Sequence, residues 1–133
     1  YGRGKNSREW IYVLDHCKAL YKIFRKGKAK ESYNIGTNQN FKNIDIAKKI
    51  ISLSKRINLH QGKSKILFVK DRPGHDLRYA LDSSKINKKL KWSAKISLEE
   101  GLANTFLWYI KNINFFSSVS KKLYDKRLGL KND

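Results

Sequence analysis

The chain has 133 residues, of which 40% are hydrophobic and 12% aromatic, a composition that predicts a packed globule rather than a disordered segment. The formal net charge of +19 would by itself suggest nucleic acid or an acidic membrane surface as a partner. The lysines, however, are spread over predicted helices without a block of like charges, and no apolar run approaches the roughly 20 residues of a membrane-spanning helix. We therefore interpret the charge as solvated helix faces.

Strand and helix signals alternate in the first third of the chain. Residues 10–13 form a short β-rich run, and Asp15 follows at a position typical of a helix N-cap. Gly27 ends the predicted helix. The apolar stripe of this helix consists of Cys17, Leu20, Tyr21 and Phe24. Residues 32–35 predict a second strand, and a crossover of this length favours parallel pairing of the two strands.

Cys17 is the single cysteine of the chain, which excludes an internal disulfide and predicts a reducing, cytoplasmic location. Because Cys17 lies in the apolar stripe of its helix, we predict that it is a small buried core residue. The sequence has no recognisable secretory signal.

The rest of the chain mixes helices with one further strand. The expected elements are, in order, an amphipathic helix over residues 44–57, a loop over 58–64, a strand over 66–69 and an irregular loop over 70–79. Asp82 is placed to cap a short helix that carries Ile86 and Leu90. The run Ser97-Leu98-Glu99-Glu100 is a capping box that opens a further helix. From Phe115 on, we expect a wrapped or frayed tail.

The residues alone indicate binding chemistry without catalytic machinery. His16, His60 and His75 have no spacing that would build a metal site. A serine nucleophile elbow and a phosphate-cradling glycine loop are both absent from the sequence. The Gly2-x-Gly4 run is too short for a dinucleotide fingerprint, so we interpret it as a turn. No catalytic or metal-binding residue is assigned.

Two polar residues at the starts of predicted elements each have two interpretations. Arg8 could clamp a pyrophosphate through two parallel hydrogen bonds, or it could form a surface salt bridge with Glu9 or Asp15, which the residues alone favour. Asn43 precedes a predicted helix, so it could be an ordinary N-cap or a ligand contact at the helix N-terminus. The two roles of Asn43 are compatible.

The run from Asp71 to His75 is the strongest candidate for a binding loop. Pro73 fixes its φ angle and Gly74 permits a conformation closed to other residues, which together predict a rigid loop. Arg72 and His75 could then point at a phosphate, while Asp71 either orients the arginine or accepts a sugar hydroxyl. On chemistry alone, a salt-bridged surface turn is the favoured alternative.

Two runs carry a resemblance to a known family. The first is Asp71-Arg72-Pro73-Gly74-His75-Asp76-Leu77-Arg78-Tyr79-Ala80-Leu81-Asp82, continued by Lys85-Ile86 and Leu90-Lys91-Trp92, and the second is Arg8-Glu9-Trp10-Ile11-Tyr12-Val13. They resemble dTDP-glucose 4,6-dehydratases, which are extended short-chain dehydrogenase/reductases, and the resemblance covers nearly the whole chain. The family has Asp where this chain has Glu9, and Gly where it has Thr37 and Lys91.

The resemblance implies an α/β fold, the carboxyl-terminal part of an extended short-chain dehydrogenase/reductase. Residues 1–36 would form a strand–helix–strand unit at the edge of a Rossmann sheet, residues 37–114 a small mixed α/β domain that binds the nucleotide sugar, and residues 115–133 a tail. The chain begins with Tyr in a turn and is expected to be cut from a longer protein. Without its parent sheet, the 10–35 unit is expected to expose a strand edge and to aggregate.

The implied activity is the hydro-lyase conversion of dTDP-glucose to dTDP-4-keto-6-deoxyglucose and water, in which a hydride passes from C4 to NAD and returns at C6. The catalytic groups and the NAD site would lie upstream of residue 1, so this chain would only position the substrate. The implied substrate-binding residues are Tyr1, Arg8, Asn43, Asp71, Arg72, Pro73, Gly74 and His75. The complete enzyme is expected to be a homodimer in the cytoplasm, with no membrane partner and no specific nucleic-acid partner.

Three alternatives stay open at this point. The chain could belong to another nucleotide-sugar dehydratase, epimerase or decarboxylase of the same superfamily, although the loop at residues 71–75 argues against this. It could be a basic nucleic-acid-binding module, whose affinity would fall steeply with salt. It could also be a truncated remnant without a function of its own.

Overall fold

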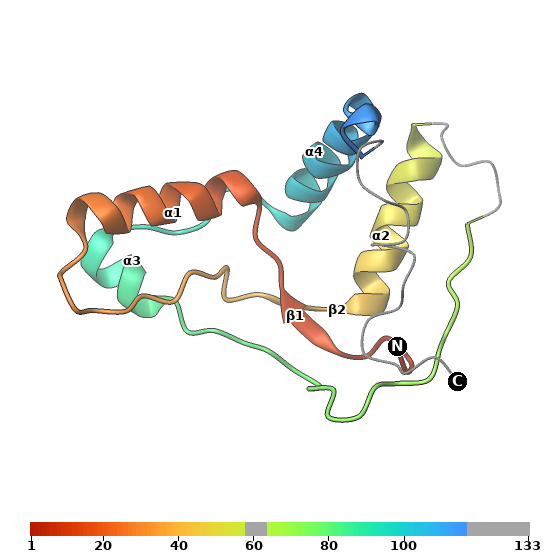
Figure 1. Cartoon of the computed structure of the whole chain (residues 1–133), viewed down its shortest axis with the longest axis horizontal. Helices are drawn as coiled ribbons and strands as arrows, with labels where there is room; N and C mark the ends of the chain where they lie inside the picture. Colours follow the sequence, from red (N-terminus) through yellow and green to blue (C-terminus); the bar gives the residue numbers. More distant parts are fainter. Residues whose placement is uncertain (58–63, 117–133) are drawn as a thin grey trace.

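A short antiparallel sheet joins distant parts of the chain in the computed structural model, which describes residues 1–57 and 64–116 (Figure 1). Strand β1 (Ser7–Glu9) pairs with β2 (Asn40–Lys42), and Arg8 lies opposite Phe41. Ser7 also forms an isolated parallel bridge with Arg78. The sheet therefore holds three segments together that are far apart in sequence.

Helices flank this sheet at both ends of the molecule. The described residues form α1 (Val13–Lys26), α2 (Asn43–Arg56), α3 (Ser84–Leu90), α4 (Leu98–Lys111) and a 3-10 helix (Ile113–Phe116). In Figure 1, α1 and α3 lie at one end and α2 and α4 at the other, with β1 and β2 between them. A 2.5 Å ion pair between Lys49 Nζ and Glu99 Oε1 joins α2 to α4. Among the described helices, none is both long and apolar enough to cross a membrane.

The core lies between α1 and α3. Ala19 of α1 and Ile86 of α3 are fully buried, and Leu90 and Trp92 are nearly so. Partly buried side chains that pack against this cluster are Ile11, Ile23, Tyr33, Ile35 and Ala94. Ile86 and Leu90 are four residues apart and so share one face of a helix, which explains why this short helix packs against α1.

The four helices and most of their ends are as the sequence predicts. Ser97 Oγ accepts a hydrogen bond from the backbone N–H of Glu100 at 3.2 Å, which confirms the N-cap of α4. The N-cap residue of α3 is Ser83 rather than the predicted Asp82, but Asp82 Oδ1 accepts a hydrogen bond from the backbone N–H of Ser84, the first residue of the helix, at 2.8 Å. The predicted loop at residues 58–63 and the tail from residue 117 lie outside the described residues.

The strands predicted at residues 10–13, 32–35 and 66–69 do not form, and neither does the predicted parallel pair. Residues 10–12, 32–35 and 66–69 are irregular. A β-rich run becomes a strand only when a partner satisfies its backbone groups. Within the described residues, β1 and β2 pair with each other, and none of the three predicted runs pairs with a strand.

Asp15 is not the N-cap of α1, because the helix begins two residues earlier and its N-cap residue is Tyr12. The Asp15 side chain is instead buried, with 1% of its surface exposed. Its Oδ2 accepts hydrogen bonds from the backbone N–H groups of Lys95 at 2.7 Å and Ile96 at 2.8 Å. Asp15 therefore fixes the segment between α3 and α4 onto α1.

Cys17 is exposed, which corrects the prediction that it is a core residue. It lies on the helix face opposite the core, together with other exposed apolar side chains of α1: Val13, Leu14, Leu20, Tyr21 and Phe24. The stripe that the periodicity identifies is therefore real, but Ala19 and Ile23 on the other face make the contacts with α3 and its neighbours. This face of α1 is an exposed apolar surface of the kind that favours association or aggregation, and the expected aggregation of the chain stays a prediction.

Candidate functional site

The first residues of the chain form the predicted turn, and this turn supports the loop at residues 71–75. The Gly4 N–H donates to the Tyr1 carbonyl at 3.1 Å, and the Gly2 N–H donates to the Val69 carbonyl at 2.7 Å. Gly2 has a φ of +51°, and a Cβ at this position would lie 2.7 Å from Asp71 Oδ2. Glycine is therefore required at position 2 both for its backbone angle and for the close approach of Asp71.

The loop is held together by Asp71. Its Oδ1 lies 2.6 Å from His75 Nδ1 and accepts a hydrogen bond from the backbone N–H of Arg72 at 2.9 Å. The Tyr1 ring lies edge-on to the His75 ring, with 6.0 Å between the centroids. Asp71 thus orients the backbone and the histidine, whose side chain is 8% exposed, and the contact engages only Nδ1 of the two ring nitrogens.

Pro73 and Gly74 form the exposed tip of this loop. Gly74 has a φ of +65°, and no atom lies within 4 Å of the place that a Cβ would occupy. The left-handed backbone, not a close contact, therefore favours glycine at position 74. Arg72 and Asp71 are also exposed, so this side of the loop is accessible to a ligand.

We expect the pKa of Asp71 to rise when His75 is replaced by alanine. The hydrogen bond with the His75 side chain, supported by the Arg72 backbone N–H, holds the pKa of Asp71 below its ordinary value of 3.8. A carboxyl with a lowered folded pKa stabilises the fold above its ordinary pKa, and this contribution is lost as the pH falls through the folded value. Carbon-detected NMR titration of the carboxyl in both proteins measures the change. An unaltered Asp71 pKa in His75→Ala would show that the contact is absent in solution.

Arg8 points from β1 toward the same loop rather than into a salt bridge. Its Nη1 donates to the Ser7 carbonyl at 2.7 Å and its Nη2 to the Asp76 carbonyl at 2.9 Å. The guanidinium carbon lies 4.4 Å from the centroid of the Tyr79 ring. In the described part of the chain, Arg8 forms no ion pair. The salt-bridge interpretation of Arg8 is therefore wrong.

The Glu9 side chain binds backbone N–H groups and does not pair with Arg8. Its carboxylate accepts hydrogen bonds from the N–H groups of Thr37 at 2.9 Å, Asn38 at 3.2 Å and Leu81 at 2.8 Å. A Cβ at Gly36 would lie 2.4 Å from Glu9 Oε2, so a larger residue here would displace the Glu9 carboxylate from its backbone partners. Glu9 thereby ties β1 to two loops and leaves the Arg8 side chain directed the other way.

Asn43 is the first residue of α2, and its side chain makes no capping hydrogen bond, so the N-cap interpretation is wrong. Its backbone N–H donates to the Asn6 carbonyl at 2.9 Å, and the Ile44 N–H donates to the Gly4 carbonyl at 3.0 Å. Asn43 Oδ1 is buried and has no hydrogen-bond partner among the described residues. A buried amide oxygen without a partner is unfavourable, so Asn43 Oδ1 is a candidate acceptor for a hydrogen-bond donor outside the described residues.

The predicted site residues therefore fall into one neighbourhood, linked by a residue that the sequence does not reveal. Asn6 is buried, with 5% of its surface exposed. Its side-chain Nδ2 donates to the Asp76 carbonyl at 3.1 Å, and its main-chain carbonyl accepts from the Asn43 N–H. Asn6 thus connects Asp76 to the start of α2. The same Asp76 carbonyl also binds Arg8. An asparagine in a glycine-rich turn gives no sequence signal for such a role.

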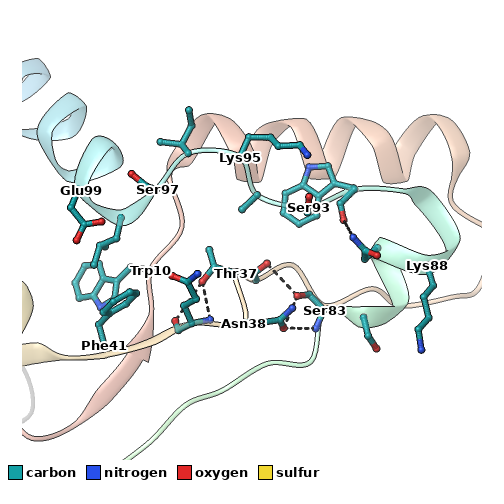
Figure 2. A pocket seen from close by; sticks show the side chains of 18 residues that line it. Trp10, Thr37, Asn38, Phe41, Ser83, Lys88, Ser93, Lys95, Ser97 and Glu99 are labelled. Atoms are coloured by element: carbon teal, nitrogen blue, oxygen red, sulfur yellow. Dashed lines mark hydrogen bonds between the residues drawn. The ribbon is translucent and has the colours of Figure 1, made fainter.

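A cavity of about 460 Å³ lies elsewhere, between residues 36–41 and the segment that joins α3 to α4 (Figure 2). Its walls include Trp10, Phe41 and Lys95, and Asn38 Oδ1 accepts hydrogen bonds from both the N–H and the hydroxyl of Ser83. None of residues 71–75 lines it. In the described residues, no group of His, Cys, Asp or Glu could hold a metal ion.

Comparisons with known proteins identify relatives of this chain. The family model described as GDP-mannose 4,6 dehydratase matches residues 1–105. A probable dTDP-glucose 4,6-dehydratase of Sinorhizobium fredii is 41% identical over 98% of this chain and 38% of its own length.

Solved structures give the same result. The dTDP-glucose 4,6-dehydratase of Bacillus anthracis in complex with NAD is 38% identical, with a TM-score of 0.78 over 90% of this chain and 36% of that one. The UDP-glucose 4-epimerase of Thermotoga maritima with UDP-glucose is 28% identical, with a TM-score of 0.75 over 85% of this chain and 34% of that one. The α/β fold class of the prediction is confirmed.

The chain thus spans little more than a third of the length of the relatives it matches. Its resemblance to dTDP-glucose 4,6-dehydratases is confirmed. Because the family model covers most of the chain, the chain belongs to the GDP-mannose 4,6 dehydratase family.

Proposed function

We propose that this chain is the substrate-binding portion of a dTDP-glucose 4,6-dehydratase and that it holds the diphosphate of the nucleotide sugar. The proposal rests on two observations: Arg8 and His75 are both held by residues of the 71–76 run, and Asn6 joins Asp76 to the start of α2, where the buried Oδ1 of Asn43 has no partner among the described residues. Cations, an imidazole and an amide are the groups that bind a diphosphate and its sugar. The similarity to dTDP-glucose 4,6-dehydratases supports the choice of ligand.

In this proposal each side chain has a distinct role. Arg8 and Arg72 donate hydrogen bonds to the phosphate oxygens, and His75 in its doubly protonated form donates from Nε2 to the ligand and from Nδ1 to Asp71. The amide of Asn43 contacts the ligand at the start of α2, where the helix dipole also favours a negative group. A fixed diphosphate fixes the glucose ring relative to the catalytic groups, which is how binding contributes to the rate of elimination.

The reaction requires parts that this sequence does not contain. A glycine fingerprint for NAD occurs nowhere in the 133 residues, so they do not fit the cofactor. We propose that NAD and the catalytic groups are held by other polypeptide of a homodimeric enzyme. In that enzyme, residues 1–36 border the NAD-binding domain, residues 37–114 bind the sugar nucleotide and residues 115–133 form a tail. The cytoplasmic location stays a prediction from cysteine content.

Calorimetric titration of the native polypeptide that contains residues 1–133 tests the ligand class. We expect saturable binding of dTDP that persists between low and moderate salt, weaker binding of UDP, and binding of a short single-stranded DNA that disappears as salt rises. Preference for UDP over dTDP would favour the sister nucleotide-sugar enzymes, among which an epimerase shares the fold. Binding of DNA that exceeds that of dTDP at moderate salt would overturn the proposal.

Residues 1–133 alone are expected to bind no NAD and to show no dehydratase turnover. The reason is that the sequence offers no glycine fingerprint for NAD, and its one Tyr and Lys spaced four apart, Tyr1 and Lys5, lie in the glycine-rich turn before β1. Titration of NAD into the purified chain should give no heat above dilution, with dTDP as the positive comparison. Tight NAD binding would contradict the assignment of the cofactor to other polypeptide.

A further inference from the structure

Tyr79 lies under the guanidinium of Arg8 and is itself held in place. The Arg8 guanidinium carbon is 4.4 Å from the Tyr79 ring centroid. The Tyr79 hydroxyl donates to Asp76 Oδ2, and the carbonyl of the same Asp76 accepts from Arg8 Nη2 at 2.9 Å. Arg8, Asp76 and Tyr79 thus form a closed set of contacts beside the loop at residues 71–75.

The set leaves Arg8 able to bind a ligand. A guanidinium has five N–H donors in a rigid plane. One on Nη1 is taken by the Ser7 carbonyl and one on Nη2 by the Asp76 carbonyl, so three are left. With one face stacked on the Tyr79 ring and two donors anchored, the plane of Arg8 is fixed before any ligand arrives.

The Tyr79 side chain has no comparable role in the core. It is 55% exposed, and it is not among the residues of the buried cluster. The backbone of Tyr79 is anchored independently, because its N–H donates to the Ser7 carbonyl at 3.1 Å. The hydrogen bond to Asp76 raises the pKa of Tyr79 above its ordinary value of 10.0, with a smaller opposing effect of Arg8, so the hydroxyl stays protonated and continues to donate.

We propose that Tyr79, oriented by Asp76, is a positioning residue that presents the Arg8 guanidinium to an anionic ligand. The identity of that ligand as a nucleoside diphosphate rests on the proposed function, whereas the positioning of Arg8 does not. Tyr79 itself contacts no ligand in this account. Its removal therefore acts through Arg8 alone.

The first arm of the test is spectroscopic and uses residues 1–133 without ligand. A proton above an aromatic ring is shifted upfield, so the Nε–H signal of Arg8 in a ¹⁵N-labelled sample should be displaced from the other arginines. Tyr79→Leu should abolish the displacement, Tyr79→Phe should retain it, and Tyr21→Leu, at another exposed tyrosine, should leave it unaltered. An Arg8 signal that is not displaced in the unmodified chain overturns the proposal, even if the leucine variant does not fold.

The second arm measures dTDP affinity in the native polypeptide that contains the chain. Tyr79→Leu should weaken binding by roughly two- to fivefold. In a protein that already carries Arg8→Ala, Tyr79→Leu should have no further effect on dTDP affinity, because the side chain that Tyr79 positions is then absent. Tyr79→Phe should lose less dTDP affinity than Tyr79→Leu, since phenylalanine keeps the aromatic ring.

The two arms separate this inference from the proposed function. If Arg8→Ala leaves dTDP affinity unaltered, the proposed function is wrong, and the spectroscopic arm still decides whether Tyr79 orients Arg8. If Arg8→Ala weakens binding while Tyr79→Leu does not, the positioning role is wrong. Equal losses from Tyr79→Leu with and without Arg8 would also overturn it.

Discussion

Replacing Arg8 or Arg72 by alanine should weaken dTDP binding roughly ten- to a hundredfold. Each replacement removes charge-assisted hydrogen bonds to the diphosphate, which contribute about 1.5–3 kcal/mol. Arg→Lys should restore only part of the affinity, because an ammonium group cannot make a planar two-pronged contact. Calorimetry on the native polypeptide measures the affinities. Melting temperatures measured beside them should change little, since Arg72 is exposed on a loop and the Arg8 side chain, within residues 1–57 and 64–116, contacts two backbone carbonyls and one ring.

Arg3→Ala is the matched control for this prediction. Arg3 is an exposed arginine in the turn that supports the loop, so its replacement removes the same charge from the same region. We expect at most a small, salt-dependent loss of affinity. A loss as large as that of Arg8→Ala would mean that general electrostatic attraction, not specific contact, explains binding. Unaltered affinity with a large drop in melting temperature would make Arg8 and Arg72 structural.

Replacing Asp15 by alanine should destabilise residues 1–133 by about 3 kcal/mol. The carboxylate is buried and accepts the backbone N–H groups of Lys95 and Ile96, so alanine would leave two donors unsatisfied and the segment before α4 unanchored. Urea denaturation followed by circular dichroism gives the free energy of unfolding.

Asp45→Ala provides the control, because Asp45 occupies the same position in the first turn of α2 as Asp15 does in α1 but is exposed. Both replacements remove the favourable interaction of a carboxylate with a helix N-terminus, which contributes about 0.3–1 kcal/mol. Asp45→Ala should cost no more than that. Equal losses at the two positions would show that the long-range anchor of Asp15 contributes little.

The sequence predicts local features of this fold better than distant ones. Helices α1 to α4 are found because their apolar periodicity and caps, such as Ser97, are encoded within a few residues. The runs at 10–13, 32–35 and 66–69 fail as strands because a strand depends on a partner elsewhere in the chain. Cys17 fails as a core residue because periodicity identifies an apolar face without showing what covers it.

The same limit applies to the candidate site. The loop at residues 71–75 is predictable because Pro73 and Gly74 determine its shape locally. Asp15 has the appearance of a cap, yet its partners are 80 and 81 residues away. The supports of Arg8 could not be read from the sequence either, because Asp76 acts partly through its main-chain carbonyl, which every residue has.

A crystal structure of the native polypeptide with dTDP bound tests the central claim most directly. The proposal predicts the diphosphate beside the loop at residues 71–75, with its oxygens about 2.7–3.2 Å from nitrogens of Arg8 and Arg72 and with the Asn43 amide paired to the ligand. A diphosphate bound away from these residues, for instance in the cavity of Figure 2, with Asn43 Oδ1 still unpaired, would contradict it.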